Sequence, residues 1–317
     1  MSLGEVDLHP VRIPMRVPFR RVTWREAVLI EGSAGWGEFS PFPEYPPTMT
    51  VRWLAAGLES AVREWPDRVR DRIPVNVTIP AVDPEIAHRT VLESGCRTAK
   101  VKVADPSDDP LADDARVAAV REALGPEGKL RIDVNAAWTV DEATVRLERL
   151  ARYDLEYAEQ PVATVDELVE LRRRTDVLLA ADESVRLADD PMEVVRRGGA
   201  DLLVLKVQPL GGVRRTLELA ERSGLPVVIS SALETSVGLA AGLAAAAALP
   251  DLRHACGLAT GRLLEGDVTS YPIQPVDGEM MVGRPVPDPA LLDLWRADPE
   301  TERRLMRRLR DAAELLT

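Results

Sequence analysis

The chain has 317 residues, a formal net charge of −12, and 45% hydrophobic and 29% charged residues. These fractions are typical of a soluble globular protein, and the length suits a domain of about 250 residues with an attached unit. The acidic balance argues against a nucleic-acid partner, because binding a phosphate backbone requires a basic surface.

Cysteine usage and hydropathy indicate the compartment. Cys96 and Cys256 lie far apart and form neither a CxxC pair nor a metal-binding pattern, which favours a reducing environment. The first residues lack the basic and apolar segments of a signal peptide, and the most apolar run, residues 237–249, is too short to span a bilayer. We therefore expect a cytoplasmic protein without a membrane partner.

Residues 1–72 have the pattern of a small α+β domain. Alternating apolar residues predict antiparallel strands over 11–15 and 26–31, and an amphipathic helix is predicted over 51–65. Prolines between positions 41 and 47 predict irregular structure before that helix.

Residues 73–268 change to an alternation of strands and helices. Strands are predicted over 75–79, 98–103, 130–134, 155–159, 177–182, 202–206 and 226–230, with a weaker one over 254–258. Helical patterns between them cover 109–124, 140–152, 165–174, 191–197 and 212–223. This alternation predicts parallel βα units, and eight of them closing on themselves make a TIM-like barrel. An open doubly wound sheet is the alternative, although no GxGxxG motif follows a first strand.

The remaining segment, residues 269–317, is rich in proline at first and then reads as a charged helix over 299–316. We expect this tail to return and pack on the first domain.

Lysine is scarce in this chain and therefore informative. Only four of the 40 basic residues are lysines, and two of them, Lys100 and Lys102, lie two positions apart on one predicted strand. Their side chains then share a face, and their mutual repulsion lowers the pKa of one of them. A lysine with a lowered pKa can act as a general base, which arginine cannot. The alternative is a pair of solvated charges on an edge strand.

Polar residues mark the C-terminal ends of the predicted strands, where barrels of this type carry their catalytic groups. In chain order these residues are Lys102, Asp133 with Asn135, Glu159, Asp182 with Glu183, Lys206, Ser230 and Ser231. Three neighbouring strands end in a carboxylate, so the three acids can converge on one point. Such a set of hard oxygen ligands predicts Mg²⁺, with Mn²⁺ as a substitute. Each acid could instead be a turn or capping residue, but the combination favours a site.

The predicted site has a definite chemistry. A divalent ion bound to a small carboxylate substrate stabilises the enolate that forms when the α-proton leaves. One lysine removes that proton. A second, cationic lysine on the other side stabilises the developing charge or acts as a base on the opposite face.

Five motifs resemble those of the enolase superfamily and, more narrowly, of its muconate-lactonising subgroup, in which lysines lie on both sides of the metal. They are Lys100-Val101-Lys102, Asp133-Val134-Asn135, Glu159-Gln160-Pro161, Asp182-Glu183-Ser184 and Lys206-Val207-Gln208-Pro209. The resemblance covers nearly the whole chain, and Trp36-Gly37-Glu38 matches the capping domain. It implies a TIM-like (β/α)7β barrel with an α+β capping domain that is formed by the N-terminal segment and the C-terminal tail.

Within the subgroup, the chain is most similar to enzymes of menaquinone biosynthesis that dehydrate 2-succinyl-6-hydroxy-2,4-cyclohexadiene-1-carboxylate to 2-succinylbenzoate. The resemblance implies that Lys102 abstracts the α-proton and then returns it to the leaving hydroxide, in a syn elimination, while Lys100 tunes it. Lys206 would stabilise the enediolate, and the three strand-end carboxylates would hold Mg²⁺.

The resemblance also implies substrate contacts. Candidates are Arg20, Arg131, Asn135, Ser230 and Ser231. Arg20 lies in the loop over residues 18–23, which is expected to cover the site. Arg131 shares a strand face with Asp133, so it either contacts the substrate or is paired inside the barrel.

Other activities remain open at this stage. The main alternative is an N-succinylamino acid racemase or another epimerase of the same superfamily, in which two lysines exchange protons on opposite faces. Dipeptide epimerases of this kind usually carry an Asp-x-Asp motif after the eighth strand, and residues 257–261 contain no acid. Muconate cycloisomerase is a weaker alternative. A non-catalytic barrel that binds a carboxylate is disfavoured by the intact carboxylates and lysines.

Overall fold

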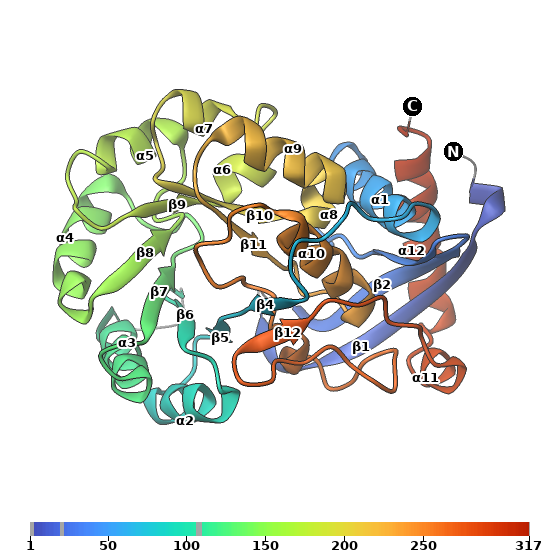
Figure 1. Ribbon diagram of the computed structural model, residues 1–317, viewed down its shortest axis with the longest axis horizontal. Helices are drawn as coiled ribbons and strands as arrows, with labels where there is room; N and C mark the ends of the chain where they lie inside the picture. Colours follow the sequence, from blue (N-terminus) through green and yellow to red (C-terminus); the bar gives the residue numbers. More distant parts are fainter. Residues whose placement is uncertain (1–2, 20–21, 106–109, 317) are drawn as a thin grey trace.

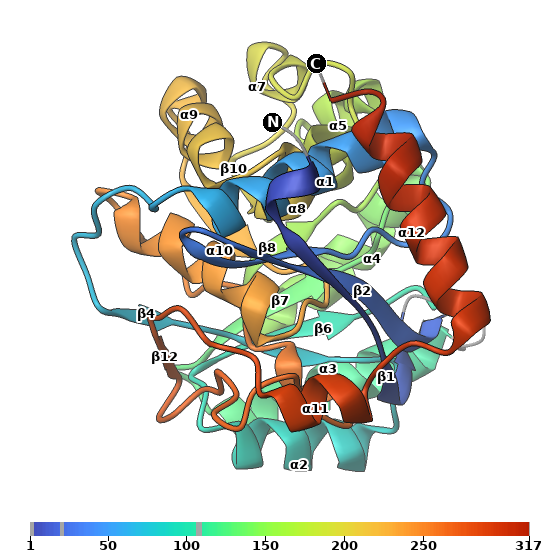
Figure 2. The same cartoon turned by 90° about the vertical axis from the view of Figure 1, so that its right-hand side faces the viewer.

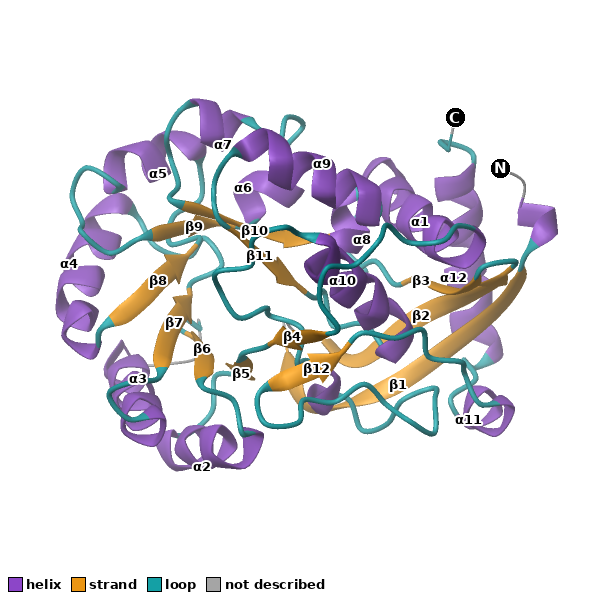
Figure 3. Cartoon of the chain, in the orientation of Figure 1, coloured by secondary structure: helices purple, strands orange, loops and turns teal. Residues whose placement is uncertain are grey.

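The computed structural model describes residues 3–19, 22–105 and 110–316 of the chain. They form two connected parts, a small antiparallel sheet with helices against it and a curled parallel sheet bordered by helices (Figure 1). The strands of the two sheets are separate in Figure 3. We call the first part the cap and the second part the barrel.

The cap consists of β1 (Asp7–Phe19), β2 (Val22–Gly32), β3 (Gly35–Phe39), α1 (Pro47–Val62) and α12 (Pro299–Ala313), after a short 3₁₀ turn at Leu3–Glu5. The strands pair antiparallel in the order β1-β2-β3, and α1 packs on β3 and α12. α12 also contacts β1 and β2, so the end of the chain returns to the N-terminal unit (Figure 2). Helix α1 begins at Pro47, earlier than predicted, because proline is tolerated in the first turn of a helix.

The barrel sheet contains parallel strands in the order β11-β10-β9-β8-β7-β6-β5. Their bounds are β5 (Val77–Ile79), β6 (Thr98–Lys102), β7 (Lys129–Asp133), β8 (Leu155–Glu159), β9 (Leu179–Ala181), β10 (Leu202–Lys206) and β11 (Val227–Ser230). The strands predicted between residues 75 and 230 are therefore all present, β8 and β10 with the predicted bounds.

Helices connect these strands. They are α2 (Pro84–Ser94), α3 (Pro110–Leu124), α4 (Val140–Leu150), α5 (Val165–Leu171), α6 (Glu183–Arg186), α7 (Glu193–Arg196), α8 (Val207–Leu210), α9 (Val213–Ser223) and α10 (Ser236–Ala248), with 3₁₀ turns at Ala151–Tyr153 and Gly261–Leu263. Capping boxes start α4 at Thr139 and α5 at Thr164, each closed by a glutamate three residues later. None of the helices in the described residues combines the length and apolar character that a membrane-spanning segment requires.

The sheet closes through the segment in which the weak eighth strand is predicted. Cys256 forms a parallel bridge with Val75, and Gly257 forms one with Ser230, so this short segment joins both edges of the sheet. Only isolated bridges form there, yet they complete the ring. The α/β barrel with a separate cap is thereby confirmed, and an open doubly wound sheet is wrong for this chain.

The tail contacts both parts. Strand β12 (Glu279–Met281) pairs antiparallel with β4 (Arg72–Pro74), just before the barrel, and α11 (Pro289–Leu294) leads to α12 in the cap. The domain boundaries after residues 72 and 268 stay predictions.

Cap side chains hold the barrel loop that follows β11. The guanidinium of Arg25 on β2 is buried and donates to the carbonyl oxygens of Ala232 and Leu233, at 3.0 and 2.7 Å. The carboxylate of Glu38 on β3 accepts from the Oγ1 of Thr235 at 2.6 Å and from the backbone N of Gly238 at 3.1 Å. The cap thus positions one wall of the barrel mouth.

Glu38 makes the stability of the fold depend on pH. Burial, together with the nearby Glu234, raises the pKa of Glu38 from 4.5 to about 7. Below pH 4.5 this carboxyl is protonated in both the folded and the unfolded chain, so it does not lower the free energy of unfolding. Between pH 4.5 and 7 the unfolded chain ionises first, so the contribution of Glu38 to the free energy of unfolding falls, by about 2–3 kcal/mol in total.

We expect Glu38→Gln to remove this loss, because the amide cannot ionise and can still accept from Thr235. Urea unfolding measures the free energy of unfolding of both proteins at pH 4.5 and at pH 7.5. The difference between variant and wild type should be about 2–3 kcal/mol more favourable to the variant at pH 7.5 than at pH 4.5. The control is Glu148→Gln on the exposed face of α4. Parallel pH profiles for Glu38→Gln and the wild type would contradict the prediction.

Candidate active site

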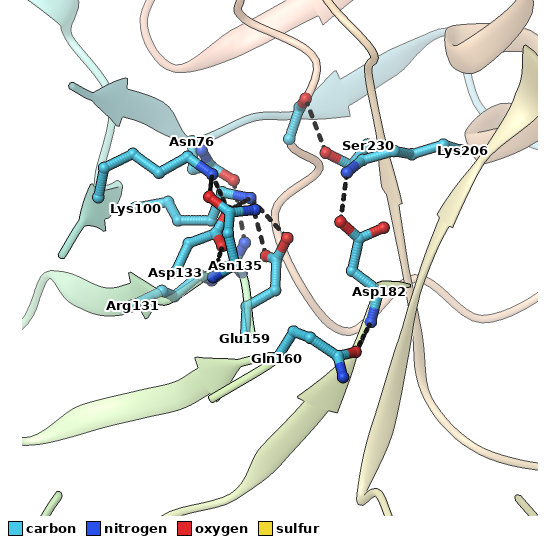
Figure 4. A network of polar contacts seen from close by, with 12 residues as sticks. Asn76, Lys100, Arg131, Asp133, Asn135, Glu159, Gln160, Asp182, Lys206 and Ser230 are labelled. Atoms are coloured by element: carbon cyan, nitrogen blue, oxygen red, sulfur yellow. Dashed lines mark hydrogen bonds and ion pairs between the residues drawn. The ribbon is translucent and has the colours of Figure 1, made fainter. Parts of the chain in front are cut away.

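The predicted strand-end residues lie together at the C-terminal edge of the barrel sheet (Figure 4). Lys102, Asp133 and Glu159 end β6, β7 and β8 at the same level, because Lys102 pairs with Asp133 and Asp133 with Glu159 in the strand register. Lys206 ends β10, and Asp182 follows β9, so the two remaining charges stand on the far side of Glu159.

Lys100 is a buried cation between two carboxylates. Its Nζ donates to Asp133 Oδ2 at 2.9 Å and to both carboxylate oxygens of Glu159 at 2.9 and 2.8 Å. Burial alone would lower the pKa of Lys100, but Asp133 and Glu159 outweigh it and hold the pKa above the ordinary lysine value. Lys100 therefore stays protonated and is not a base.

Lys102 is the lysine with a lowered pKa. Its Nζ donates to Asp133 Oδ2 and to Asn135 Oδ1, both at 2.5 Å. Burial lowers the pKa of Lys102 most, Asp133 opposes this effect, and the charge of Lys100 adds to it. The larger cause of this shift is burial, and the repulsion by Lys100 that the sequence predicts is a smaller one.

Asp182 is held on both oxygens. Lys206 Nζ donates to Oδ2 at 2.5 Å, and Arg186 Nε donates to Oδ1 at 2.9 Å. Burial would raise the pKa of Asp182, but Arg186 and Lys206 together hold it below the ordinary range. Asp182 is therefore an ionised carboxylate at neutral pH.

The three carboxylates do not meet at one point as the sequence predicts. Asp133 and Glu159 face Lys100, whereas Asp182 faces Lys206 and Arg186, because the cations supply the counter-charge in a buried environment. Accordingly, no three carboxylate, histidine or cysteine side chains in the described ranges come close enough to enclose a metal ion. Burial, reinforced by Asp133, raises the pKa of Glu159 to about 7.

Two adjoining cavities open beside the lysines. A narrow one of about 30 Å³ is lined by side chains that include Lys100, Lys102, Lys206, Ser230 and Ser231. A larger one of about 710 Å³ shares Phe19, Lys102 and Asn135 with it. Lys102 thus lines both cavities.

The candidate substrate contacts fall into three groups. Asn135, Ser230 and Ser231 line the narrow cavity. Arg131 is fully buried and donates to Glu156 Oε2 at 2.6 Å, so of its two predicted alternatives the structure supports an interior ion pair. Arg20 lies outside the described residues.

Sequence reasoning missed several residues at the site. Thr260, whose Oγ1 lies 2.6 Å from Ser231 Oγ, and Phe19 line the narrow cavity, while Arg186 and Tyr45 lie behind Asp182. Tyr45 gives no local signal, because it reaches Asp182 only through Arg186, which lies 141 positions later in the chain. Arg186 follows Asp182 by four residues, and Phe19 lies in the loop that is predicted to cover the site.

Family models match both parts of the chain. Residues 84–289 match the model described as enolase C-terminal domain-like, and residues 11–61 match the model described as enolase N-terminal domain-like. The matched ranges cover most of the barrel and of the N-terminal elements of the cap.

Curated relatives give a narrower assignment. An o-succinylbenzoate synthase of Thermobifida fusca (strain YX) is 60% identical over 272 residues, which cover 86% of each chain. Another, from Mycolicibacterium smegmatis (strain ATCC 700084 / mc(2)155), is 52% identical over 298 residues, 93% of this chain and 91% of the relative. Among solved structures, muconate lactonizing enzyme from Pseudomonas fluorescens superposes with a TM-score of 0.79 at 22% identity, over 92% of this chain and 98% of that one, and supports the fold. The chain therefore belongs to the enolase superfamily and, within it, to the o-succinylbenzoate synthases, a family of hydro-lyases.

Proposed function

We propose that this protein is a Mg²⁺-dependent o-succinylbenzoate synthase that converts 2-succinyl-6-hydroxy-2,4-cyclohexadiene-1-carboxylate into 2-succinylbenzoate and water, in the cytoplasm, for menaquinone biosynthesis. The observation that carries the proposal is the placement of Lys102 on β6 and Lys206 on β10, with the strands that lead to three buried carboxylates between them. Both lysines line a cavity, in a chain that is 60% identical to a synthase of this kind.

The carboxylates fit a hard divalent cation in their chemistry. Asp133, Glu159 and Asp182 offer only carboxylate oxygens, which Mg²⁺ and Mn²⁺ prefer, and each side chain is at most 1% exposed. The raised pKa of Glu159 marks a place where more positive charge is favourable. When bound, the metal would neutralise the substrate carboxylate and so make the α-proton acidic enough for an amine base.

Lys102 is the proposed base. Its lowered pKa favours the neutral amine, and Lys102 lines both cavities, where a substrate can reach it. The amine takes the α-proton, the electron pair of that C–H bond forms the enediolate, and the C–O bond to the hydroxyl then breaks. The Lys102 ammonium returns its proton to the departing hydroxide, which leaves as water, so the elimination is syn.

Lys206 and Lys100 act as cations in this proposal. Lys206, which is 7% exposed and lines the narrow cavity, faces the developing enediolate charge from the side opposite Lys102. Lys100 keeps its proton and, through its charge, helps to keep the pKa of Lys102 low. Asn135, Ser230 and Ser231 are the proposed polar substrate contacts.

The dehydration assay tests the proposal directly. Purified protein with Mg²⁺ should convert the cyclohexadiene carboxylate to the aromatic product, followed by absorbance. Dialysis against a chelator should lower the rate about 100-fold or more, and added Mg²⁺ or Mn²⁺ should restore it.

Two results would count against the proposal. Conversion at an unchanged rate after chelation would show that the reaction does not depend on Mg²⁺. Absence of conversion, combined with α-proton exchange between N-succinylamino acids and ²H₂O, would replace the synthase with a racemase.

A further inference from the structure

We infer that Arg186 and Tyr45 are positioning residues that tie the cap to Asp182. The inference rests on the proposed function in one respect, namely that Asp182 binds a divalent cation. It assigns a role in the site to a cap residue, Tyr45, that lines neither of the two cavities.

Arg186 has all three nitrogens engaged. It lies on the single turn α6, and its side chain is 1% exposed. Nε donates to Asp182 Oδ1 at 2.9 Å, one terminal nitrogen donates to Glu183 Oε1 at 2.6 Å, and the other donates to Tyr45 Oη at 2.7 Å. Because a guanidinium is planar and rigid, these bonds fix its orientation relative to both parts of the protein.

The contact with Arg186 leaves one oxygen of Asp182 directed at the site. Oδ1 is held by Arg186, whereas Oδ2 faces Lys206 on β10. A carboxylate fixed at one oxygen cannot rotate freely about its Cβ–Cγ bond. Outer partners of this kind orient metal-binding carboxylates and raise their affinity.

Tyr45 is itself fixed by the cap. Its backbone oxygen accepts from Arg308 of α12 at 3.1 Å. The centroid of its ring lies 6.1 Å from the ring centroids of Phe42 and of Trp53, which is on α1. The position of the Tyr45 hydroxyl therefore depends on elements from both ends of the chain.

A branch of the same network reaches Lys102. Glu183 Oε1, which accepts from Arg186, also accepts from Asn135 Nδ2 at 3.1 Å. Asn135 Oδ1 in turn accepts from Lys102 Nζ at 2.5 Å. One guanidinium thus supports the orientation of a carboxylate and, through two side chains, of the proposed base.

The test measures Mn²⁺ binding by calorimetry, which does not depend on turnover. Arg186→Lys keeps the charge but loses the planar fork, and we expect its Kd for Mn²⁺ to rise about 10–100-fold. Tyr45→Phe keeps the ring and removes one hydrogen bond, and its Kd should rise about 3–10-fold. In the Arg186→Lys background, Tyr45→Phe should have almost no further effect, because the shared partner is gone.

The matched control is Tyr153→Phe. It makes the same chemical change, since Tyr153 Oη accepts from Arg152 at 2.9 Å, but it lies before β8, at the other end of the barrel. Its Kd for Mn²⁺ should equal that of the wild type. Melting curves without metal identify any variant that has lost its fold.

The outcomes separate this inference from the proposed reaction. If the wild type binds Mn²⁺ but does not dehydrate the cyclohexadiene carboxylate, only the proposed reaction is overturned, and the Kd values of the variants still test the positioning role. A folded Arg186→Lys variant whose Kd lies within twofold of the wild-type value would overturn the positioning role. So would equal effects of Tyr45→Phe in both backgrounds, or absence of Mn²⁺ binding by the wild type.

Discussion

Lys102→Arg should lower kcat for the dehydration by about 10²–10⁴-fold, with KM changed only a few-fold. The arginine side chain is also long and can still donate to Asp133, so binding of the carboxylate substrate is largely retained. It cannot give up its proton at any accessible pH, so no neutral base stands at this position. Steady-state kinetics with saturating Mg²⁺ measures both constants.

The chain provides a suitable control for this substitution. Lys129 lies at the start of β7, is exposed, and is at the opposite end of the strand from Asp133. Lys129→Arg should leave kcat and KM unchanged. A kcat of Lys102→Arg within tenfold of the wild type would mean that another group removes the proton, and Lys206 would be the next residue to test.

Gly37→Ala should destabilise the protein by about 3 kcal/mol. A Cβ at Gly37 on β3 would lie 1.9 Å from the carbonyl oxygen of Gly57 on α1, so the strand and the helix would have to separate. The atom in the way belongs to the backbone and cannot turn aside like a side chain. Urea unfolding at constant pH measures the loss as a lower transition midpoint.

Gly283→Ala is the corresponding control. A Cβ at this position would meet no atom within 4 Å, so the free energy of unfolding should stay within about 0.5 kcal/mol of the wild-type value. Equal stability of Gly37→Ala and Gly283→Ala would show that β3 and α1 can move apart at little cost.

The barrel was predictable because short strand-like segments alternate with helical patterns over residues 73–268. Strands β8 and β10 have the predicted bounds for this reason, and the residues that end them, Glu159 and Lys206, follow directly. The segment around Cys256 gave only a weak pattern, and in the structure it forms bridges rather than a regular strand. Local sequence therefore determines the order of the strands better than it determines how the ring closes.

The electrostatics of the site could be predicted only in part. Alternation of side chains correctly places Lys100 and Lys102 on one face. The opposite shifts of their pKa values, however, follow from burial and from contacts with Asp133 and Glu159. The contact between Arg186 and Tyr45 joins residues 141 positions apart, and no local sequence pattern predicts such a pair.

The order of synthesis gives the divided cap a further consequence. Arg308 of α12 donates to the carbonyl oxygens of Pro41, Phe42 and Tyr45, and α12 follows the whole barrel in the chain. On the ribosome, all the barrel strands leave the exit tunnel before the helix that supports this loop. The loop that carries Tyr45 therefore gains this support only after the whole barrel and α12 have been synthesised.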